Sequence, residues 1–525
     1  MNIRELIESR AAATPEKIYL YFEDQKITYE NFNRQINRAA NAFTKLGIGK
    51  ADHFAVMLPN SPEFLYSWFG LNKIGAVQVP LNTNLSSPEL QYILEHSEAK
   101  GIVIHKSYLP VLTGIHPVPP HLKSVIVVGD EDHSASKTLH YHDIIANASD
   151  ELPPVSIAED DPAVIIYTSG TTGNPKGVQL SHRCWMLTGE SWTYMIDARA
   201  EDRIMTSNPL FHANAEAYST IGSLVAGASL ILLPKFSRSQ ILEQAREYHS
   251  TILVSVMAAM PMIWSRPNQP NDAENPIRLI MAGGVPSEYY GEFQKRFGGE
   301  VVTIYSLTEA MFAIMAPREG ARTRKPTPGV GVAMEHPDPS IVNEVKIVDE
   351  SGKEAPRGDH GQIIIKNPAV MIGYFKDPEK TAETKREGWI YTGDIGYQDE
   401  EGYFYFVGRS KELLRRRGEL ISPAQIESVL LSHPKVLDGT VIGVPTNLGT
   451  GEEEVKAYVI PRPGEKLNPE ELVSWCEKHL ADFKVPRYIE FRTDFPRTPK
   501  GSVQKNVLKS EKKDLTVDCY DRLKQ

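Results

Sequence analysis

Short apolar runs alternate with helix-spaced apolar positions along residues 30–310. Runs of strand length stand at residues 54–58, 125–128, 163–167, 229–233 and 253–256. Residues 30–46 instead carry apolar side chains at helical spacing and stop at Gly47, a common end for a helix. This alternation is typical of α/β proteins with largely parallel sheets. We therefore predict an α/β fold for the large N-terminal part of the chain.

Two segments of that part repeat one pattern. Residues 64–80 and 216–234 each read as a helix, a Gly-Ala turn, a strand and a terminal proline. The chain shows no short repeating period, so a solenoid is not expected. The repeat predicts two related α/β sheet layers.

After about residue 325 the pattern changes to short β-like runs, such as 344–348 and 362–366, separated by Gly, Pro and Asp. We predict an N-terminal domain at 1–411, with a β subdomain at about 325–411. A small mobile α+β lobe at 412–525 is predicted to follow. Its expected elements are helices at 423–431 and 469–480, strands near 440–444 and 455–460, and a charged surface tail from Ser510.

The composition is that of an ordinary globular protein. The 525 residues are 41% hydrophobic and 24% charged, with a formal net charge of −10. The acidic balance argues against bulk nucleic-acid binding. Three widely spaced cysteines suggest a reducing compartment, and no apolar run approaches membrane-spanning length. The N-terminus does not read as a signal peptide. We expect a cytoplasmic protein without a membrane span, either a monomer or a homodimer.

The most informative stretch is 165–177, where an apolar run enters a loop rich in glycine, hydroxyl groups and one lysine. Glycines allow close backbone approach to a ligand, while hydroxyls and a lysine suit a polyphosphate. The candidate phosphate ligands are Thr168, Ser169, Gly170, Thr171, Thr172 and Lys176. The loop is not a Walker A motif, because Lys176 is followed by Gly177 rather than by Ser or Thr. A polar surface turn is the alternative interpretation.

Further motifs follow in one order along the chain. They are Pro-Leu-Phe-His at 209–212, Ala-Gly-Gly at 282–284, Tyr-Ser-Leu-Thr-Glu at 305–309, Tyr-Thr-Gly-Asp at 391–394, Gly-Arg-Ser-Lys-Glu at 408–412 and Pro-Arg-Thr-Pro-Lys-Gly-Ser at 496–502. The series resembles the adenylate-forming, or AMP-binding, superfamily: acyl-CoA synthetases, carrier-protein adenylation domains and firefly luciferase. The resemblance covers nearly the whole chain.

The resemblance implies a role for each motif residue. It places Tyr305 against adenine, with Gly283 and Gly284 as nearby backbone. It also implies that Thr308 bonds the α-phosphate and that Glu309 binds Mg²⁺, which favours carboxylate and phosphate oxygens. Ser306 stands where the family usually has glycine, which would narrow the space near the reacting carboxylate.

The later motifs are implied to bind the ribose and CoA. Asp394 would bond the ribose hydroxyls and Arg409 the ribose or a phosphate, while His212 would lie between the acyl site and the pantetheine tunnel. Gly418 would allow close approach of pantetheine, and arginines 415–417 could meet CoA phosphates. Glu412 stands at the family's hinge between lobes. The alternative is a core or surface position for His212, and a solvated position for Asp394, Arg409 and the three arginines.

The main departure from the family pattern is at the C-terminus. The pattern ends in Gly-Lys, and that lysine bridges the carboxylate and the α-phosphate during adenylation. This chain has Ser502 there and a lysine at Lys500. Residues two apart share a face in an extended segment, so Lys500 could reach the same site, whereas Lys505 should point elsewhere.

The predicted function is an AMP-forming acyl-CoA synthetase that uses ATP, Mg²⁺, CoA and a small carboxylic acid. A carrier-protein-loading enzyme and a nucleotide-binding protein impaired by Ser502 are the alternatives. Residues 200–225 look most like carnitine/crotonobetaine-type and fatty-acid CoA ligases. Within them, the sequence favours Glu216 on a solvated helix end. If Glu216 were instead buried in the acyl pocket, it would need a cationic partner or a raised pKa.

Overall fold

The computed structural model describes residues 1–129, 138–168, 174–255, 259–282, 290–317, 331–416, 419–446, 452–497 and 503–524. The chain divides into two compact units. The first comprises Met1–Lys346, Ile364–Thr392 and Asp399–Tyr405, and the second comprises Ile347–Ile363, Gly393–Gln398 and Phe406–Gln525. The predicted boundary between residues 411 and 412 stays a prediction.

An eight-stranded sheet of the first unit has the strand order β19-β9-β8-β4-β3-β5-β6-β7. Its strands are β3 (His53–Met57), β4 (Val77–Pro80), β5 (Gly101–His105), β6 (Ser124–Val128), β7 (Leu139–His140), β8 (Pro162–Thr168), β9 (Lys176–Ser181) and β19 (Gly373–Tyr374). Pairing is parallel from β8 to β7, and β9 and β19 add antiparallel pairs at the other edge.

A nine-stranded sheet of the same unit has the order β16-β15-β14-β13-β12-β10-β11-β1-β2. Its strands are β1 (Ile18–Phe22), β2 (Gln25–Thr28), β10 (Arg203–Thr206), β11 (Ser229–Leu232), β12 (Ile252–Ser255), β13 (Leu279–Ala282), β14 (Glu300–Leu307), β15 (Ala310–Met315) and β16 (Val332–Ala333). The pairs from β1 to β14 are parallel, and β14 turns back into β15 as an antiparallel hairpin. The prediction of two largely parallel sheets is confirmed.

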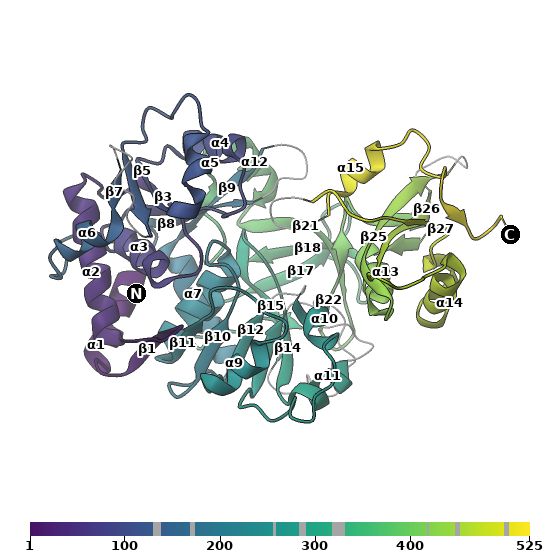
Figure 1. Cartoon of the computed structure of the whole chain (residues 1–525), viewed down its shortest axis with the longest axis horizontal. Coiled ribbons are helices and arrows are strands. Elements are labelled where there is room, and N and C mark those ends of the chain that lie inside the picture. Colours follow the sequence, from purple (N-terminus) through teal and green to yellow (C-terminus); the bar gives the residue numbers. More distant parts are fainter. Residues whose placement is uncertain are drawn as a thin grey trace. The chain divides into compact units, whose positions relative to one another are not determined.

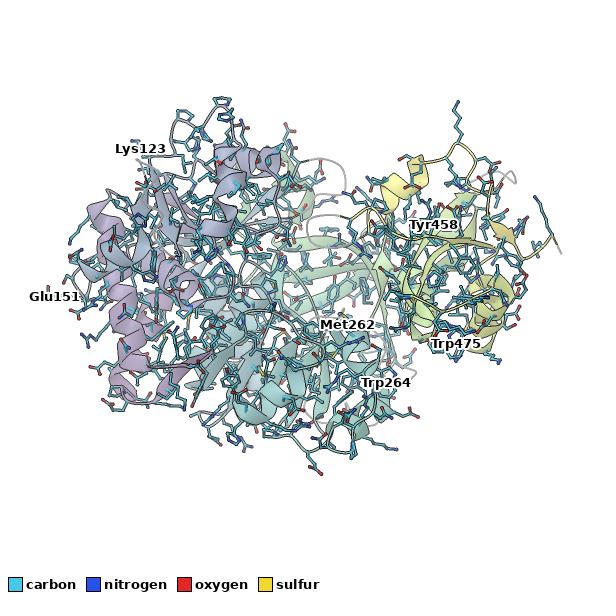
Figure 2. The ribbon with its side chains drawn as sticks, in the orientation of Figure 1. Lys123, Glu151, Met262, Trp264, Tyr458 and Trp475 are labelled. Carbon is cyan, nitrogen blue, oxygen red and sulfur yellow. The ribbon has the colours of Figure 1, made fainter. Side chains whose placement is uncertain are left out.

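Helices pack on these sheets, and α1, α2 and α3 lie side by side in Figure 1. The helices of the first unit are α1 (Ile3–Ala13), α2 (Tyr29–Lys45), α3 (Pro62–Lys73), α4 (Ser87–Ser97), η1 (Lys106–Tyr108), α5 (Leu109–Thr113), α6 (Tyr141–Ala146), α7 (His182–Ile196), η2 (Ala215–Ile221), α8 (Gly222–Ala226), α9 (Ile241–Glu247), α10 (Ala259–Trp264), α11 (Tyr290–Phe297) and α12 (Pro378–Thr384). Side chains interlock the helices: Trp264 of α10, labelled in Figure 2, stacks on Phe293 of α11 with ring centroids 6.1 Å apart.

The two repeated segments fold as predicted, with one difference. Each turns into its strand through a left-handed glycine, Gly75 before β4 and Gly227 before β11. Positive φ is a conformation that glycine adopts without steric cost, which explains the shared Gly-Ala turn. The helix of the second segment starts with a π-helical stretch, η2, before it becomes α8. Such π-helical turns are rare and often occur at functional sites.

The residues after 331 form further β-strands separated by turns, as their turn-rich sequence predicts. A five-stranded sheet contains β17 (Glu344–Val348), β18 (Gly361–Lys366), β20 (Lys385–Arg386), β21 (Trp389–Gln398) and β22 (Phe404–Arg409). A two-stranded sheet follows, with β23 (Leu414–Arg416) and β24 (Glu419–Ile421).

The last part of the chain builds a sheet and helices around its own core. Strands β25 (Val436–Pro445), β26 (Glu453–Pro461), β27 (Tyr488–Phe491) and β28 (Tyr520–Asp521) form a four-stranded sheet. The helices are α13 (Pro423–Ser432), α14 (Pro469–His479), η4 (Asp482–Lys484) and α15 (Lys505–Ser510). The tail is therefore more than a charged surface element, because β28 pairs with β27 and Asp521 forms an ion pair with Arg487.

Candidate active site

The β14–β15 hairpin carries the Tyr-Ser-Leu-Thr-Glu motif. Leu307 pairs with Ala310, so Thr308 and Glu309 form the two-residue turn at the tip of the hairpin. Both side chains are half-buried, and Tyr305 lies buried in β14. The hairpin thus holds the predicted α-phosphate and metal ligands together at one half-buried turn.

Tyr374 connects that turn to the end of the predicted phosphate loop. Its hydroxyl donates a 2.8 Å hydrogen bond to Oε1 of Glu309, and the Nζ atom of Lys176 lies 5.1 Å from the centre of its ring. Burial, and next the negative charge of Glu309, raise the pKa of Tyr374. The phenol therefore keeps its proton and remains a hydrogen-bond donor.

Backbone pairing explains why Tyr374 lies there. Strand β19 pairs with β9, with Tyr374 opposite Val178, two residues from Lys176. Just before β19, the N–H of Met371 donates to the carbonyl oxygen of Glu309 at 2.9 Å, and Val370 bridges to Ala310. Sequence reasoning missed Tyr374, because a tyrosine in a short strand reads as a core residue. Only the long-range pairing of β19 reveals its position.

The two ends of the predicted phosphate loop meet in the sheet. Thr168 closes β8 and pairs with Lys176 at the start of β9. This antiparallel pair joins the residues that flank the loop. Ser169, Gly170, Thr171 and Thr172 lie outside the described residues, as do Gly283 and Gly284, which follow β13.

The predicted acyl region lies around η2. His212 is half-buried and contacts the ring of Phe211, with centroids 4.6 Å apart. The carbonyl of His212 accepts hydrogen bonds from two backbone N–H groups at the start of the π-helical stretch. Further along, the buried Tyr218 donates to the carbonyl of Met311 at 2.7 Å and hydrogen-bonds the Ser306 side chain. These contacts join η2 to the β14–β15 hairpin.

The prediction of a solvated Glu216 is wrong. Its side chain is 0% exposed on η2, and neither carboxylate oxygen has a hydrogen-bond partner among the residues that the structure describes. Burial raises the pKa of Glu216 well above its ordinary value. Glu216 does lie at a helix end, in the first turn of η2, but every residue of η2 is buried, so this helix end is not solvated.

Asp394 and Arg409 approach one another within the second unit. Asp394 lies buried on β21, and its Oδ1 atom is 3.7 Å from Nε of Arg409, at the end of β22. The backbone N–H of Ser410 donates to the carbonyl of Gly393, which joins the two motifs. The structure thus brings together the two residues predicted to contact the ribose.

Comparison with known proteins identifies the family. The family model described as AMP-binding enzyme matches residues 7–375, and the model of the AMP-binding enzyme C-terminal domain matches residues 425–502. The chain belongs to the AMP-binding enzyme family.

Two of the proteins that the chain resembles are named CoA ligases. The chain is 34% identical to a crotonobetaine/carnitine–CoA ligase of Salmonella heidelberg (strain SL476), over 97% of this chain and 99% of the relative. Its fold matches the anthranilate CoA ligase AuaEII in complex with anthranoyl-AMP (TM-score 0.87, 27% identity, 97% of each chain). It also matches ATP-bound MatB from Rhodopseudomonas palustris (TM-score 0.83, 30% identity, 97% and 98% covered).

These matches confirm the predicted superfamily, the α/β fold class and the acyl-CoA ligase function. Among the described residues, no helix is both long enough and apolar enough to cross a membrane. The three cysteines, Cys184, Cys476 and Cys519, carry free thiols.

The C-terminal candidates divide into two groups. Arg416 is buried, forms an ion pair with Glu454 at 2.7 Å and donates to the carbonyl of Phe483 at 2.8 Å. Arg416 therefore supports the fold and offers no cation to CoA phosphates, which corrects the prediction for this arginine, whereas Arg415 on the same strand is exposed. Lys505 forms a 2.7 Å ion pair with Glu427. Arg417, Gly418, Lys500 and Ser502 lie outside the described residues.

The residues at the hairpin tip fit a magnesium ion carried with ATP. Among the described residues there is no group of three or more His, Cys, Asp or Glu side chains that could hold a metal. Magnesium does not need such a group, because it is commonly held by one or two carboxylates together with substrate phosphates. Glu309 is a half-buried carboxylate whose Oε1 atom is oriented by Tyr374, and its donor chemistry matches that requirement.

Proposed function

We propose that this acyl-CoA ligase activates a small carboxylic acid with ATP and Mg²⁺, then transfers the acyl group to coenzyme A. In the first step a carboxylate oxygen attacks the α-phosphorus. The bond from that phosphorus to the bridging oxygen breaks, and pyrophosphate leaves with the electron pair. In the second step the CoA thiol loses its proton, its sulfur attacks the acyl carbon, and AMP leaves.

The convergence of Lys176, Tyr374 and Glu309 carries this proposal. Carboxylate and α-phosphate both carry negative charge, so their approach must be offset by positive charge. Lys176 supplies one charge at the end of the phosphate loop. Glu309 would hold the magnesium ion, which supplies more positive charge when bound. Thr308, on the same turn, would donate its hydroxyl proton to an α-phosphate oxygen.

The remaining roles concern the nucleotide and the acid. Tyr305 would lie against the adenine, and Asp394 with Arg409 would hold the ribose. His212 would line the path between acid and thiol. These assignments rest on the family motifs and on the positions of the described residues in each unit.

Product analysis tests the reaction. A panel of carboxylic acids with ATP, Mg²⁺ and CoA should yield AMP, pyrophosphate and a thioester in equal amounts. Acid-dependent ADP as the main nucleotide product would contradict the proposal. Thioester formed only on a phosphopantetheinyl carrier protein would support the carrier-loading alternative. Absence of acid-dependent pyrophosphate release would support an impaired enzyme.

Glu216 favours an acid that carries a cationic group. A carboxyl group with 0% exposure and no partner among the described residues is costly to ionise, unless a cation is placed beside it. A quaternary ammonium acid would supply that charge, and the 34% identical Salmonella relative is named for such acids.

Competition between matched acids tests this preference. The kcat/KM for carnitine or crotonobetaine should be higher than that for the isosteric uncharged acid, in which carbon replaces nitrogen. Glu216→Gln should reduce that preference by about 10-fold or more, because it removes one charged partner. A wild-type preference for the uncharged acid, left unchanged by Glu216→Gln, would refute the assignment.

A further inference from the structure

The two-residue turn of the β14–β15 hairpin fixes the backbone at Glu309 but leaves its carboxylate free to move. Thr308 and Glu309 are the only two residues between the paired Leu307 and Ala310, and both are half-buried. A glutamate side chain has several rotatable bonds, so an unrestrained carboxylate would sample many positions. Magnesium demands near-ideal octahedral geometry, and a scattered carboxylate would bind it poorly.

Segment 370–374 restrains Glu309 at both its backbone and its side chain. The Met371 N–H holds the Glu309 carbonyl at 2.9 Å, and the Tyr374 hydroxyl holds Oε1 at 2.8 Å. Tyr374 is itself held, because it is buried, its backbone N–H donates to Oγ1 of Thr381 at 2.9 Å, and the Thr384 side chain bonds its hydroxyl.

The same aromatic ring contacts the nucleotide-binding side of the site. The Nζ atom of Lys176 lies 5.1 Å from the ring centre, within the range of a cation–π contact. Tyr374 therefore touches the metal ligand through its hydroxyl and the phosphate-loop lysine through its ring. These two contacts come from different strands of two different sheets, β14–β15 and β9.

We propose that Tyr374 is a positioning residue that orients Glu309 for magnesium and Lys176 for the phosphates. It acts through these two groups and takes no part in bond making or breaking. The inference rests on the proposed function, in which Glu309 holds magnesium and Lys176 a phosphate. The two roles of Tyr374 can be tested separately, because its hydroxyl contacts Glu309 and its ring contacts Lys176.

Two variants distinguish the contact made by the hydroxyl from the contact made by the ring. Tyr374→Phe removes only the hydroxyl, while Tyr374→Leu removes the hydroxyl and the aromatic face. Either variant is informative if the other fails to fold. Tyr29→Phe is the matched control, because the buried Tyr29 hydroxyl also donates to an oxygen, the Ala228 carbonyl at 2.6 Å, but contacts none of these site residues.

The main readout is binding of α,β-methylene-ATP, an analogue that cannot release pyrophosphate, by calorimetry. Tyr374→Phe should raise the Kd by about 10-fold with magnesium and leave it nearly unchanged when magnesium is chelated, because a charge-assisted hydrogen bond is lost. Tyr374→Leu should also raise the magnesium-free Kd by about 3-fold through the lost cation–π contact. Tyr29→Phe should match the wild type in both conditions.

A double-mutant cycle with Glu309→Ala tests whether Tyr374 acts through Glu309. In the Glu309→Ala background, Tyr374→Phe should cause no further loss of magnesium-dependent affinity. In steady-state assays, Tyr374→Phe should raise the magnesium concentration for half-maximal rate by a similar factor.

Three results would overturn the inference. They are unchanged magnesium-dependent affinity in Tyr374→Phe, an equal loss with and without magnesium, and additive losses in the double variant. Suppose that the wild type binds the analogue with magnesium and forms AMP from ATP, and that Tyr374→Phe matches it in both assays. That result rejects only this inference. A wild type without magnesium-dependent nucleotide binding rejects the proposed function as well.

Discussion

The free energy of unfolding of the first unit should fall as pH rises because of Glu216, and Glu216→Gln should abolish this contribution. The substitution keeps the size of the side chain but replaces a titratable carboxyl group with a neutral amide. Burial raises the pKa of Glu216 above its ordinary value of 4.5, and the side chain is 0% exposed. The folded protein therefore keeps this carboxyl protonated at pH values where the unfolded chain has already released the proton.

The sign and size of the effect follow from proton linkage. Above pH 4.5 the folded state binds more protons at residue 216 than the unfolded state. Stability must then fall as pH rises, by about 1.4 kcal/mol per pH unit up to the folded-state pKa. Between pH 5.5 and 7.5 the loss reaches at most about 2.7 kcal/mol, or about 3 °C in Tm for a unit of this size.

Differential scanning calorimetry at the two pH values provides the assay. The Tm difference between Glu216→Gln and the wild type should grow by up to about 3 °C from pH 5.5 to 7.5. The control is Glu247→Gln, at an exposed position on α9, which should leave the wild-type pH dependence unchanged. Equal pH dependence in the wild type and Glu216→Gln would refute the reasoning.

Substrate binding adds a second test of the same group. If a cationic acid binds next to Glu216, the carboxyl group should ionise and release a proton on binding. Calorimetry in buffers of different ionisation enthalpy measures that proton directly. Glu216→Gln should show no such release, and the isosteric uncharged acid should show none with either protein.

Four further outcomes are expected. Glu309→Gln should slow acid-dependent pyrophosphate release by about 10²-fold or more, with an unchanged circular dichroism spectrum. Asp394→Ala should mainly raise the KM for ATP. Near-normal turnover in both variants would contradict the assigned site. Lys500→Ala should slow adenylate formation by about 10²-fold while sparing thioester formation from supplied acyl-adenylate. If Ser502→Lys accelerates adenylation strongly and Lys500→Ala has no effect, Lys500 is a surface residue. Burial lowers the pKa of His182 to about 4, so the folded state keeps this ring neutral at pH values where the unfolded chain protonates it. The free energy of unfolding should therefore fall by up to about 3 kcal/mol as the pH drops from 6.5 to 4. His182→Leu should flatten this decline in Tm on the acid side.

Much of the architecture could be predicted from the order of residues. Strands such as β3 and β6 agree with the predicted runs to within about a residue, since alternation of strand and helix patterns is a local property. Gly75 and Gly227 were identified as turns because positive φ is a backbone requirement of single residues. The π-helical register of η2 was not predictable, because the apolar spacing there suits an ordinary helix.

The candidate site divides in the same way. The motif containing Thr308 and Glu309 was recognisable because a two-residue turn and its chemistry lie within five consecutive residues. Tyr374 lies 65 residues from its hydrogen-bond partner Glu309. Nothing in its own neighbourhood indicates that contact, which depends on the pairing of β19 with β9.

Sequence alone determined the family, the α/β class and the chemistry expected at each motif, because these depend on residue types in short, ordered strings. Tertiary structure alone decided that Glu216 and Arg416 are buried and that Tyr374 joins Glu309 to Lys176. Burial and partner choice depend on which distant segments pack together. A glutamate or arginine is solvated when it lies on the surface. The same side chain costs free energy when it is buried without a partner.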